Sequence, residues 1–181
     1  MSALEEVLGF WFAPGREAQW FAVSEEFDGA VRRTLLSHLE AARMGKFEAW
    51  KREPRGCVGL CILLDQVPRN VFRGTPRAFA SDAEARAVTR HALAEGFDQT
   101  LSDNERMFLY LPLEHSETLQ DQQDCVRLVA GLRNPGEFLA YAERHRDIIA
   151  RFGRFPHRNA VLGRESTEEE LTFLKEPNSS F

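Results

Sequence analysis

The chain has 181 residues, of which 43% are hydrophobic and 28% are charged, and its formal net charge is −5. These values are ordinary for a globular protein, and the length suits one domain with a real core. The negative charge argues against a general nucleic-acid-binding protein, because such a protein needs a basic face to neutralise phosphates. We therefore expect a single domain over residues 1–181 with no nucleic-acid partner.

The N-terminus, MSALEEVLGFWF, contains two glutamates and has no basic start, so it is not expected to be a secretory signal. No later segment has the uninterrupted apolar length of a membrane span. The cysteines, Cys57, Cys61 and Cys125, are sparse and odd in number, which fits a reducing compartment better than a disulfide framework. We expect a cytoplasmic protein with no membrane partner and with buried structural thiols, with metal or redox use of the thiols as the alternative.

Helical periodicity dominates the first third of the chain. Apolar residues on one stripe of LEEVLGFWF predict a first helix, which Pro14 and Gly15 end. Ser24 is typical of an N-cap and predicts a second helix. Pro54 can begin a third, and the stretch CVGLCILL is apolar on all sides, as in a buried central helix. This helix ends in DQVP, whose polar groups need partners if they are buried.

Polar residues and prolines mark the helix ends expected in the rest of the chain: Asp82, Asp103 and Ser116 as caps, Pro112 as a kink or an end, NPG at 134–136 as a break, and Thr167 with Glu170 as a capping box. No convincing strand alternation is present. The sequence therefore predicts an all-α fold, with residues 176–181 loose at the C-terminus.

Two distant stretches have similar sequences, QVPRNVFRG from residue 66 and RFPHRNAVLGR from residue 154. Each places an Arg-Asn pair after a proline and follows it with apolar residues and a glycine. The surplus of guanidinium groups suits a carboxylate or phosphate ligand, because the planar fork of arginine can hold either. The same groups suit ion pairs within the protein, with the asparagines closing turns, and the sequence leaves both interpretations open.

The stretch LEHSE places His115 and Glu117 on either side of Ser116. Helix capping is one interpretation of Ser116 and Glu117. In another, His115 is a base oriented by Glu117, or the two are metal ligands. No H-E-x-x-H motif is present, and we expect no metal site. His145 falls on an apolar helical stripe, either as a core histidine bonded to a neighbour or as one that faces an internal cavity. Glycine-rich phosphate and dinucleotide loops are absent, and no cofactor is expected.

Three long stretches resemble a bacterial family known as domain of unknown function 924: LLDQVPRNVFRGTPRAFASD, YLPLEHSE with QDQQD after it, and HRDIIARFGRFPHRNAVLGRESTEEELTFL. The opening VLGFWF resembles the start of that family, although Gly9 stands where the family leads us to expect a polar residue, which weakens any role for the first helix in a site. The resemblance implies an all-helical, compact domain of packed antiparallel helix pairs, similar to tetratricopeptide-repeat proteins. It implies no activity, substrate or cofactor.

The residues favour a site for a small anionic or polar molecule, with the two Arg-Asn stretches as two halves of one polar cradle. The ligand-binding residues expected are Asp65, Arg69, Asn70, Arg73, His145, Arg158 and Asn159. The residues expected to move protons are His115, Glu117 and His157. Hydrolysis is the reaction that this set favours, and the sequence leaves open whether the protein is an enzyme.

Two alternatives have no ligand site. In the first, the protein is an interaction module whose concave surface binds a protein partner, with aromatic anchors at Trp11, Trp20, Phe21 and Trp50. In the second, the polar residues only satisfy helix ends within the domain.

Overall fold

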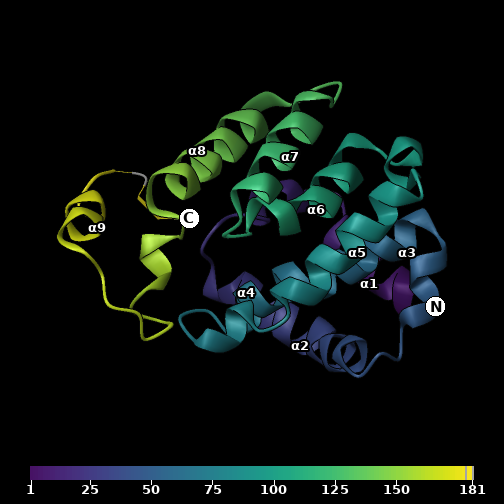
Figure 1. The fold of residues 1–181 in the computed structure, drawn as a ribbon. Helices are drawn as coiled ribbons and strands as arrows, with labels where there is room; N and C mark the ends of the chain where they lie inside the picture. Colours follow the sequence, from purple (N-terminus) through teal and green to yellow (C-terminus); the bar gives the residue numbers. More distant parts are fainter. Residues whose placement is uncertain (178, 181) are drawn as a thin grey trace. The chain divides into compact units, whose positions relative to one another are not determined.

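The computed structural model describes residues 1–177 and 179–180, which form helices, turns and loops with no strand among them (Figure 1). The all-α fold class is confirmed, while the likeness to tetratricopeptide repeats stays a prediction. No helix in these residues is both long and apolar enough to span a membrane. Residue contacts divide the chain into unit 1, Met1–Arg73 with Arg77–Pro112, and unit 2, Gly74–Pro76 with Leu113–Phe181. The single domain stays a prediction.

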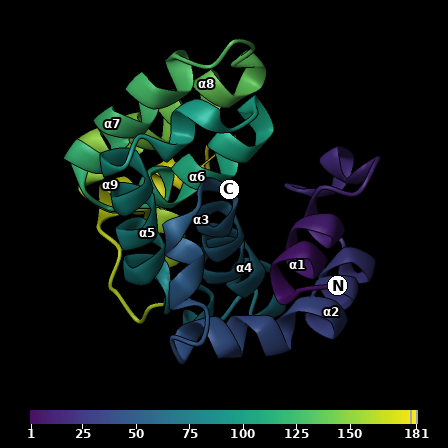
Figure 2. The ribbon, with the colours of Figure 1, turned by 90° about the vertical axis from the view of Figure 1, so that its right-hand side faces the viewer.

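Unit 1 contains the N-terminal helices. Within it, α2 packs against α4, α3 packs against α5, and α1 lies beside α2 (Figure 2). Its α-helices are α1 Ala3–Trp11, α2 Glu25–Arg43, α3 Pro54–Cys61, α4 Val67–Val71, α5 Asp82–Ala94 and most of α6 Asp103–Glu114. The last two residues of α6, after Pro112, belong to unit 2. Short turns connect them: η1 Arg16–Gln19, η2 Glu48–Arg52, η3 Ile62–Gln66, η4 Pro76–Phe79 and η5 Phe97–Thr100.

The apolar stretch after Pro54 forms the buried centre of unit 1, as predicted. Pro54 is the first residue of α3, and residues 56–68 are all buried. After Cys61 the helix widens into η3, which is a π-helical turn. A π-turn holds an extra residue, so a 3.6-residue period does not predict it. This turn places the polar side chains of Asp65 and Gln66 in buried positions.

Aromatic side chains form much of the core of unit 1. The rings of Trp11 and Trp20 lie 5.6 and 4.8 Å from that of Phe108, edge to face. Trp20 also donates from Nε1 to the Trp11 carbonyl at 2.8 Å. Both tryptophans are buried, so neither is an exposed anchor for a protein partner, as the interaction module would need. Of the other two candidates, Phe21 is exposed and Trp50 is half-buried.

The three cysteines are buried thiols outside any disulfide, as predicted. Burial raises the pKa of the Cys57 thiol to about 11, and it raises those of Cys61 and Cys125 well above the ordinary value. Since the thiolate is the reactive form of cysteine, these residues are unsuited to act as nucleophiles near neutral pH.

Unit 2 contains α7 Leu119–Ala130, α8 Gly136–Phe152, the turn η6 Pro156–Arg158 and α9 Glu168–Phe173. Helices α7 and α8 lie side by side, and the predicted break at residues 134–136 separates them in the chain (Figure 1). Ile148 and Ile149 of α8 form a buried apolar cluster with Phe155, and Phe152 and Phe173 pack against it. The predicted capping box at the start of α9 is present.

The caps predicted for α5 and α6 are displaced. Asp82 is the first residue of α5, and its carboxylate binds Arg69 instead of capping the helix. Ser102, rather than Asp103, caps α6, because its Oγ accepts from Glu105 N at 3.4 Å. The sequence alone does not decide which of two adjacent polar residues caps a helix, since serine and aspartate are both good N-caps.

Ser116 lies three residues before α7, which begins at Leu119. Its Oγ donates to Asp121 at 2.6 Å and accepts from Thr118 N at 3.2 Å. Ser116 therefore stabilises the segment that precedes α7 and is not the N-cap of the helix. Of the C-terminal residues expected to be loose, 178 and 181 lie outside the described residues, and Ser179 is buried with its Oγ donating to the Leu174 carbonyl.

Candidate functional site

The site residues predicted from the sequence are divided between the two units. Asp65, Arg69, Asn70 and Arg73 belong to unit 1. Unit 2 contains His115, Glu117, His145, His157, Arg158 and Asn159. The single cradle made from both Arg-Asn stretches stays a prediction, and each group is described by itself.

In unit 1, Arg69 is held between two carboxylates. Its Nη1 lies 3.1 Å from Asp65 Oδ1, and its two Nη atoms donate to Asp82 at 2.9 and 3.1 Å. Burial acts to lower the pKa of Arg69, but the charges of Asp65 and Asp82 outweigh it and keep that pKa above its ordinary value. The guanidinium is therefore engaged by carboxylates of its own unit, as in the structural interpretation that the sequence left open.

The asparagines do not close turns in the left-handed conformation. Asn70 lies in α4 and donates from Nδ2 to the Gln66 carbonyl at 3.0 Å, and Asn159 has φ −58°. Glycine has that conformation in both stretches, at Gly74 with φ 74° and at Gly163 with φ 66°. The likeness of the two sequences therefore reflects a shared spacing from the Arg-Asn pair to a left-handed glycine.

Arg73, the remaining candidate in unit 1, binds Asp28 of α2. Its Nε and Nη2 donate to the two carboxylate oxygens at 2.8 and 2.9 Å. This fork ties the end of α4 to α2, which is a structural role.

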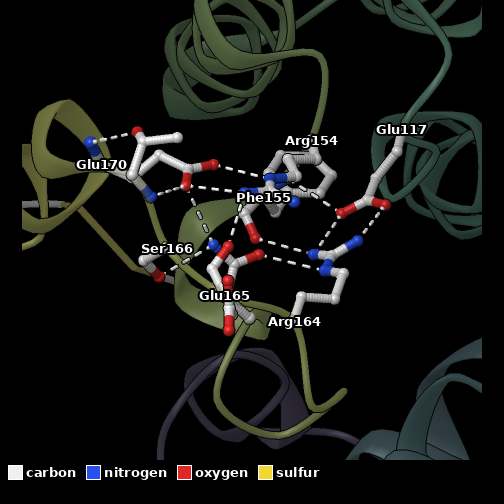
Figure 3. Close-up of polar contacts among 9 residues, drawn as sticks. Glu117, Arg154, Phe155, Arg164, Glu165, Ser166 and Glu170 are labelled. Carbon is white, nitrogen blue, oxygen red and sulfur yellow. Dashed lines mark hydrogen bonds and ion pairs between the residues drawn. The ribbon is translucent and has the colours of Figure 1, made fainter.

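In unit 2, the second Arg-Asn stretch builds a connected ionic network (Figure 3). Arg164 donates from both Nη atoms to Glu117, at 2.7 and 2.9 Å, and from Nη2 to the Phe155 carbonyl at 3.1 Å. Glu117 also accepts from Phe155 N at 2.9 Å. Arg154 donates to both oxygens of Glu170, at 2.6 and 2.8 Å. Phe155 is thus held at its N–H and at its carbonyl by one ion pair.

Asn159 joins the two ion pairs of this network. Its Nδ2 lies 3.3 Å from Glu170 Oε2, and its Oδ1 accepts from Arg164 Nε at 3.0 Å. Burial acts to raise the pKa of Glu117, but hydrogen bonds from Arg164 and Phe155 outweigh it and lower that pKa. An ionised carboxylate held in this way fixes the backbone around residues 155–159, while its predicted part in proton transfer stays a prediction.

The turn fixed by this network carries two members of a histidine cluster. The ring of Phe155 lies 5.6 Å from the rings of both His145 and His157. His115 lies 6.1 Å from His145, ring centre to ring centre. The Arg158 guanidinium lies over the Phe155 ring, 4.4 Å from its centre. The residues His115, His145, His157 and Arg158, with Glu114, are called the histidine cluster below.

Two buried side chains hold the backbone at the C-terminal end of α6. Gln122 donates from Nε2 to the carbonyls of Glu114 and Ser116, at 2.5 and 2.7 Å. Arg158 donates from Nη1 to the His115 carbonyl at 3.0 Å. The last carbonyls of a helix have no partner within it, so buried ones need donors from elsewhere. These contacts fix the positions of Glu114 and His115.

His145 and Glu114 form the buried part of the cluster. Their exposed fractions are 4% and 7%, and His145 Nδ1 lies 3.5 Å from Glu114 Oε1. Nδ1 is also 2.8 Å from the Tyr141 carbonyl, which can only accept, so Nδ1 carries the proton. His145 therefore fits the interpretation of a buried histidine bonded to a neighbour, while the internal cavity of the other interpretation stays a prediction.

Burial is the main influence on the pKa values of His145 and His157. It lowers the pKa of His145 to about 3, with the nearby His115 adding to the effect. It lowers the pKa of His157 to about 4, and Arg158 acts in the same direction. Both imidazoles are therefore neutral near pH 7. Because His115 and His157 are half-buried, the cluster extends from the interior toward the surface.

Sequence reasoning missed Glu114 and Gln122. Glu114 had a usable signal, since it follows Met107 and Leu111 at helical spacing and so places a carboxylate on an apolar face of α6. Gln122 gave no such signal, because an amide in a polar run such as QDQQD is ordinarily exposed. The Arg164–Glu117 pair joins residues 47 positions apart, which no local pattern predicts.

The protein is thus all-helical in its described residues and has a cluster of histidines and other polar side chains in its C-terminal unit. The chain belongs to a family described as bacterial protein of unknown function (DUF924), whose model matches residues 7–178, and this confirms the resemblance. It is also similar to the solved structure of a protein of unknown function from Agrobacterium tumefaciens, with 38% identity and a TM-score of 0.90 over 95% of this chain and 96% of that one. The comparison with curated proteins gives no match.

Proposed function

We propose that the protein binds a small polar or anionic molecule at the histidine cluster of unit 2. The observation that carries this proposal is the grouping of three of the chain's five histidines: His145 and His157 lie against the Phe155 ring, His115 lies beside His145, and a guanidinium lies over the same Phe155 ring. Titratable side chains gathered in a partly buried place are a frequent feature of binding and active sites.

Arg158 is the group best placed to attract an anion. Its contacts with the His115 carbonyl and the Phe155 ring fix the plane of the guanidinium inside the cluster. A fixed guanidinium suits carboxylate and phosphate groups, because its N–H groups match the spacing of their oxygens. His115 and His157 are half-buried neighbours that would contact the ligand from the solvent side.

The ionic network supports the cluster without belonging to it. Glu117 and Arg164 hold Phe155 at both backbone groups, and Asn159 connects them to the pair of Arg154 and Glu170. Binding groups work best when surrounding residues hold them in place. If a reaction occurs, hydrolysis of a polar metabolite fits these groups, with His115 or His157 transferring the proton.

The test is thermal unfolding in increasing concentrations of inorganic phosphate and, separately, of succinate. A ligand at ten times its Kd adds about 1.4 kcal/mol to the free energy of unfolding, which raises the Tm by roughly 3–5 °C in a protein of this size. We expect a saturable rise in the wild-type protein that is lost in Arg158→Gln. Arg127→Gln, an exposed arginine of α7 that pairs with Asp124, is the matched control and should respond like the wild type.

Two results contradict the proposal. One is a wild-type Tm that neither anion changes. The other is a rise of the same size in Arg158→Gln, which would place the anion elsewhere on the protein.

A further inference from the structure

Glu114, His115 and His145 bring three potential metal-ligand atoms together. One atom from each side chain lies within 4.8 Å of the other two. We propose that these residues bind a divalent transition-metal ion such as Zn²⁺. This inference deepens the proposed function, because the ion would bind within the same histidine cluster, and the two can be tested separately.

Side-chain rotation can bring these atoms to the spacing that one ion requires. Zinc–nitrogen and zinc–oxygen distances are about 2.0–2.2 Å, so two ligand atoms of one tetrahedral ion lie about 3.4 Å apart. The Glu114 carboxylate and the His145 ring are already neighbours, since Oε1 lies 3.5 Å from Nδ1, the ring nitrogen that carries the proton. The spacings are at most 4.8 Å, so side-chain rotation that closes them by up to about 1.4 Å brings all three atoms into range.

The hydrogen bond of His145 is of the kind that metal-binding histidines make. Nδ1 donates to the Tyr141 carbonyl at 2.8 Å, which leaves the lone pair on Nε2. A metal-bound histidine usually donates its other ring N–H to a carbonyl or a carboxylate, and this contact fixes both the tautomer and the ring. Tyr141 therefore supplies the orienting contact for one ligand.

The other two ligands are fixed through their backbone. Gln122 holds the Glu114 carbonyl and Arg158 holds the His115 carbonyl, so the end of α6 presents both side chains from a rigid position. The C-terminal end of a helix also carries a partial negative charge, which favours a cation. A divalent ion would further compensate the buried charge of the Glu114 carboxylate.

The ligand set selects the class of ion. Two imidazoles and one carboxylate suit Zn²⁺ or Fe²⁺, whereas Mg²⁺ and Ca²⁺ prefer oxygen ligands throughout. Three protein ligands leave at least one coordination position for water or for an atom of a bound molecule. Arg158, which contacts the His115 carbonyl, is close enough to the site to hold an anionic group of that molecule.

The experiment is a calorimetric titration of ZnCl₂ into the full chain after dialysis against a chelator. We expect one zinc ion per chain, and an affinity at least tenfold lower in Glu114→Gln and in His145→Gln, since loss of outer contacts alone costs about 10–100-fold. The matched control is His38→Gln, which removes the histidine of another histidine–glutamate pair, 3.0 Å from Glu6 in unit 1, and should leave zinc binding unchanged. Binding that is not stoichiometric in the wild type, or that is as tight in both cluster variants as in the wild type, overturns the proposal.

A second measurement covers the case in which the buried variants do not fold. His115 is half-buried, so His115→Gln should keep the fold, which far-ultraviolet circular dichroism would check. Cobalt added to the metal-free wild type should give visible d–d absorption that zinc abolishes and that His115→Gln lacks. An unchanged cobalt spectrum in His115→Gln overturns the proposed ligand set.

The metal site and the anion site fail in different ways. A flat zinc titration together with a phosphate-dependent rise in Tm in metal-free protein rejects the metal ion and keeps the proposed function. Stoichiometric zinc binding that the cluster variants lose, without any effect of phosphate or succinate, supports the metal site and rejects the anion site.

Discussion

At the scale of single residues, most of the arginines in the two Arg-Asn stretches that were candidates for ligand binding form ion pairs with carboxylates of the protein itself. Arg69 binds Asp65 and Asp82, and Arg73 binds Asp28. The contacts with Asp82 and Asp28 use both arms of the guanidinium fork. The same holds for Arg154 and Arg164 in unit 2. Lysine cannot reproduce such paired contacts, because its ammonium group is a single point charge.

We therefore expect Arg164→Lys to lower the free energy of unfolding by about 1–2 kcal/mol, since it removes the fork on Glu117 and the bonds to the Phe155 carbonyl and Asn159. Arg127→Lys, which alters an exposed pair with Asp124, should change it by less than about 0.5 kcal/mol. Urea unfolding followed by circular dichroism measures both. Equal effects of the two changes would show that the network around Phe155 adds no stability.

Glu170 should make the stability depend on pH in the acid range. The hydrogen bonds from Arg154 are the main cause of its lowered pKa of about 2, against an ordinary value of 4.5. Between these two values the unfolded chain takes up a proton that the folded chain does not. The contribution of Glu170 is therefore complete above pH 4.5 and is lost as the pH falls toward 2.

In Glu170→Gln this contribution is absent at every pH, because the amide does not titrate. We expect the variant to be less stable than the wild type by about 1–2 kcal/mol at pH 7. The difference should shrink as the pH is lowered from 5 to 3, measured by urea unfolding at each pH. A difference that stays constant over this range would show that the carboxylate titrates normally in the folded protein.

At the scale of elements, the backbone of α3 packs so closely against the preceding segment that one of its positions has to be glycine. A Cβ atom on Gly56 would lie 2.1 Å from the Trp50 carbonyl oxygen, and that oxygen belongs to the backbone. Gly9 of α1 is the opposite case, since a Cβ there would meet nothing within 4 Å. One glycine is needed for the approach of two backbone segments, and the other only weakens its helix.

Gly56→Ala should accordingly destabilise the protein by about 3 kcal/mol or more, because backbone must shift to admit the methyl group. Gly9→Ala should stabilise it by about 0.5–1 kcal/mol, because alanine favours the helix and restricts the unfolded chain. Thermal unfolding of the two variants beside the wild type gives both signs. A Gly56→Ala protein as stable as the wild type would contradict the close approach.

At the scale of the whole molecule, the distribution of tryptophans allows the single domain to be tested. Trp11, Trp20 and Trp50 all belong to unit 1, whereas Arg164 and its partners belong to unit 2. If the chain unfolds as one domain, Arg164→Lys should shift the urea midpoint of tryptophan fluorescence as much as that of circular dichroism. A fluorescence midpoint that the change leaves unmoved would mean that the units unfold independently.

The sequence by itself determined the all-α class, the family and many of the helix ends. Ser24, Pro54 and the Thr167–Glu170 box act within one turn of helix, so their neighbours in the chain are also their neighbours in space. The observed N-cap positions of α6 and α7 are Ser102 and Thr118, and they lie within two residues of the predicted ones. Local patterns of this kind can be recognised because their geometry is set by the helical repeat.

Only the tertiary structure decided which polar groups meet. Arg73 binds Asp28, Arg158 binds the His115 carbonyl and Arg164 binds Glu117. These partners are 45, 43 and 47 residues apart in the sequence. The tertiary structure also revealed that the carboxylate beside His145 is Glu114, which was not among the candidate residues. Such partners depend on how helices pack, and a guanidinium suits an internal carboxylate as well as a ligand, so sequence alone could name the candidate residues but not their partners.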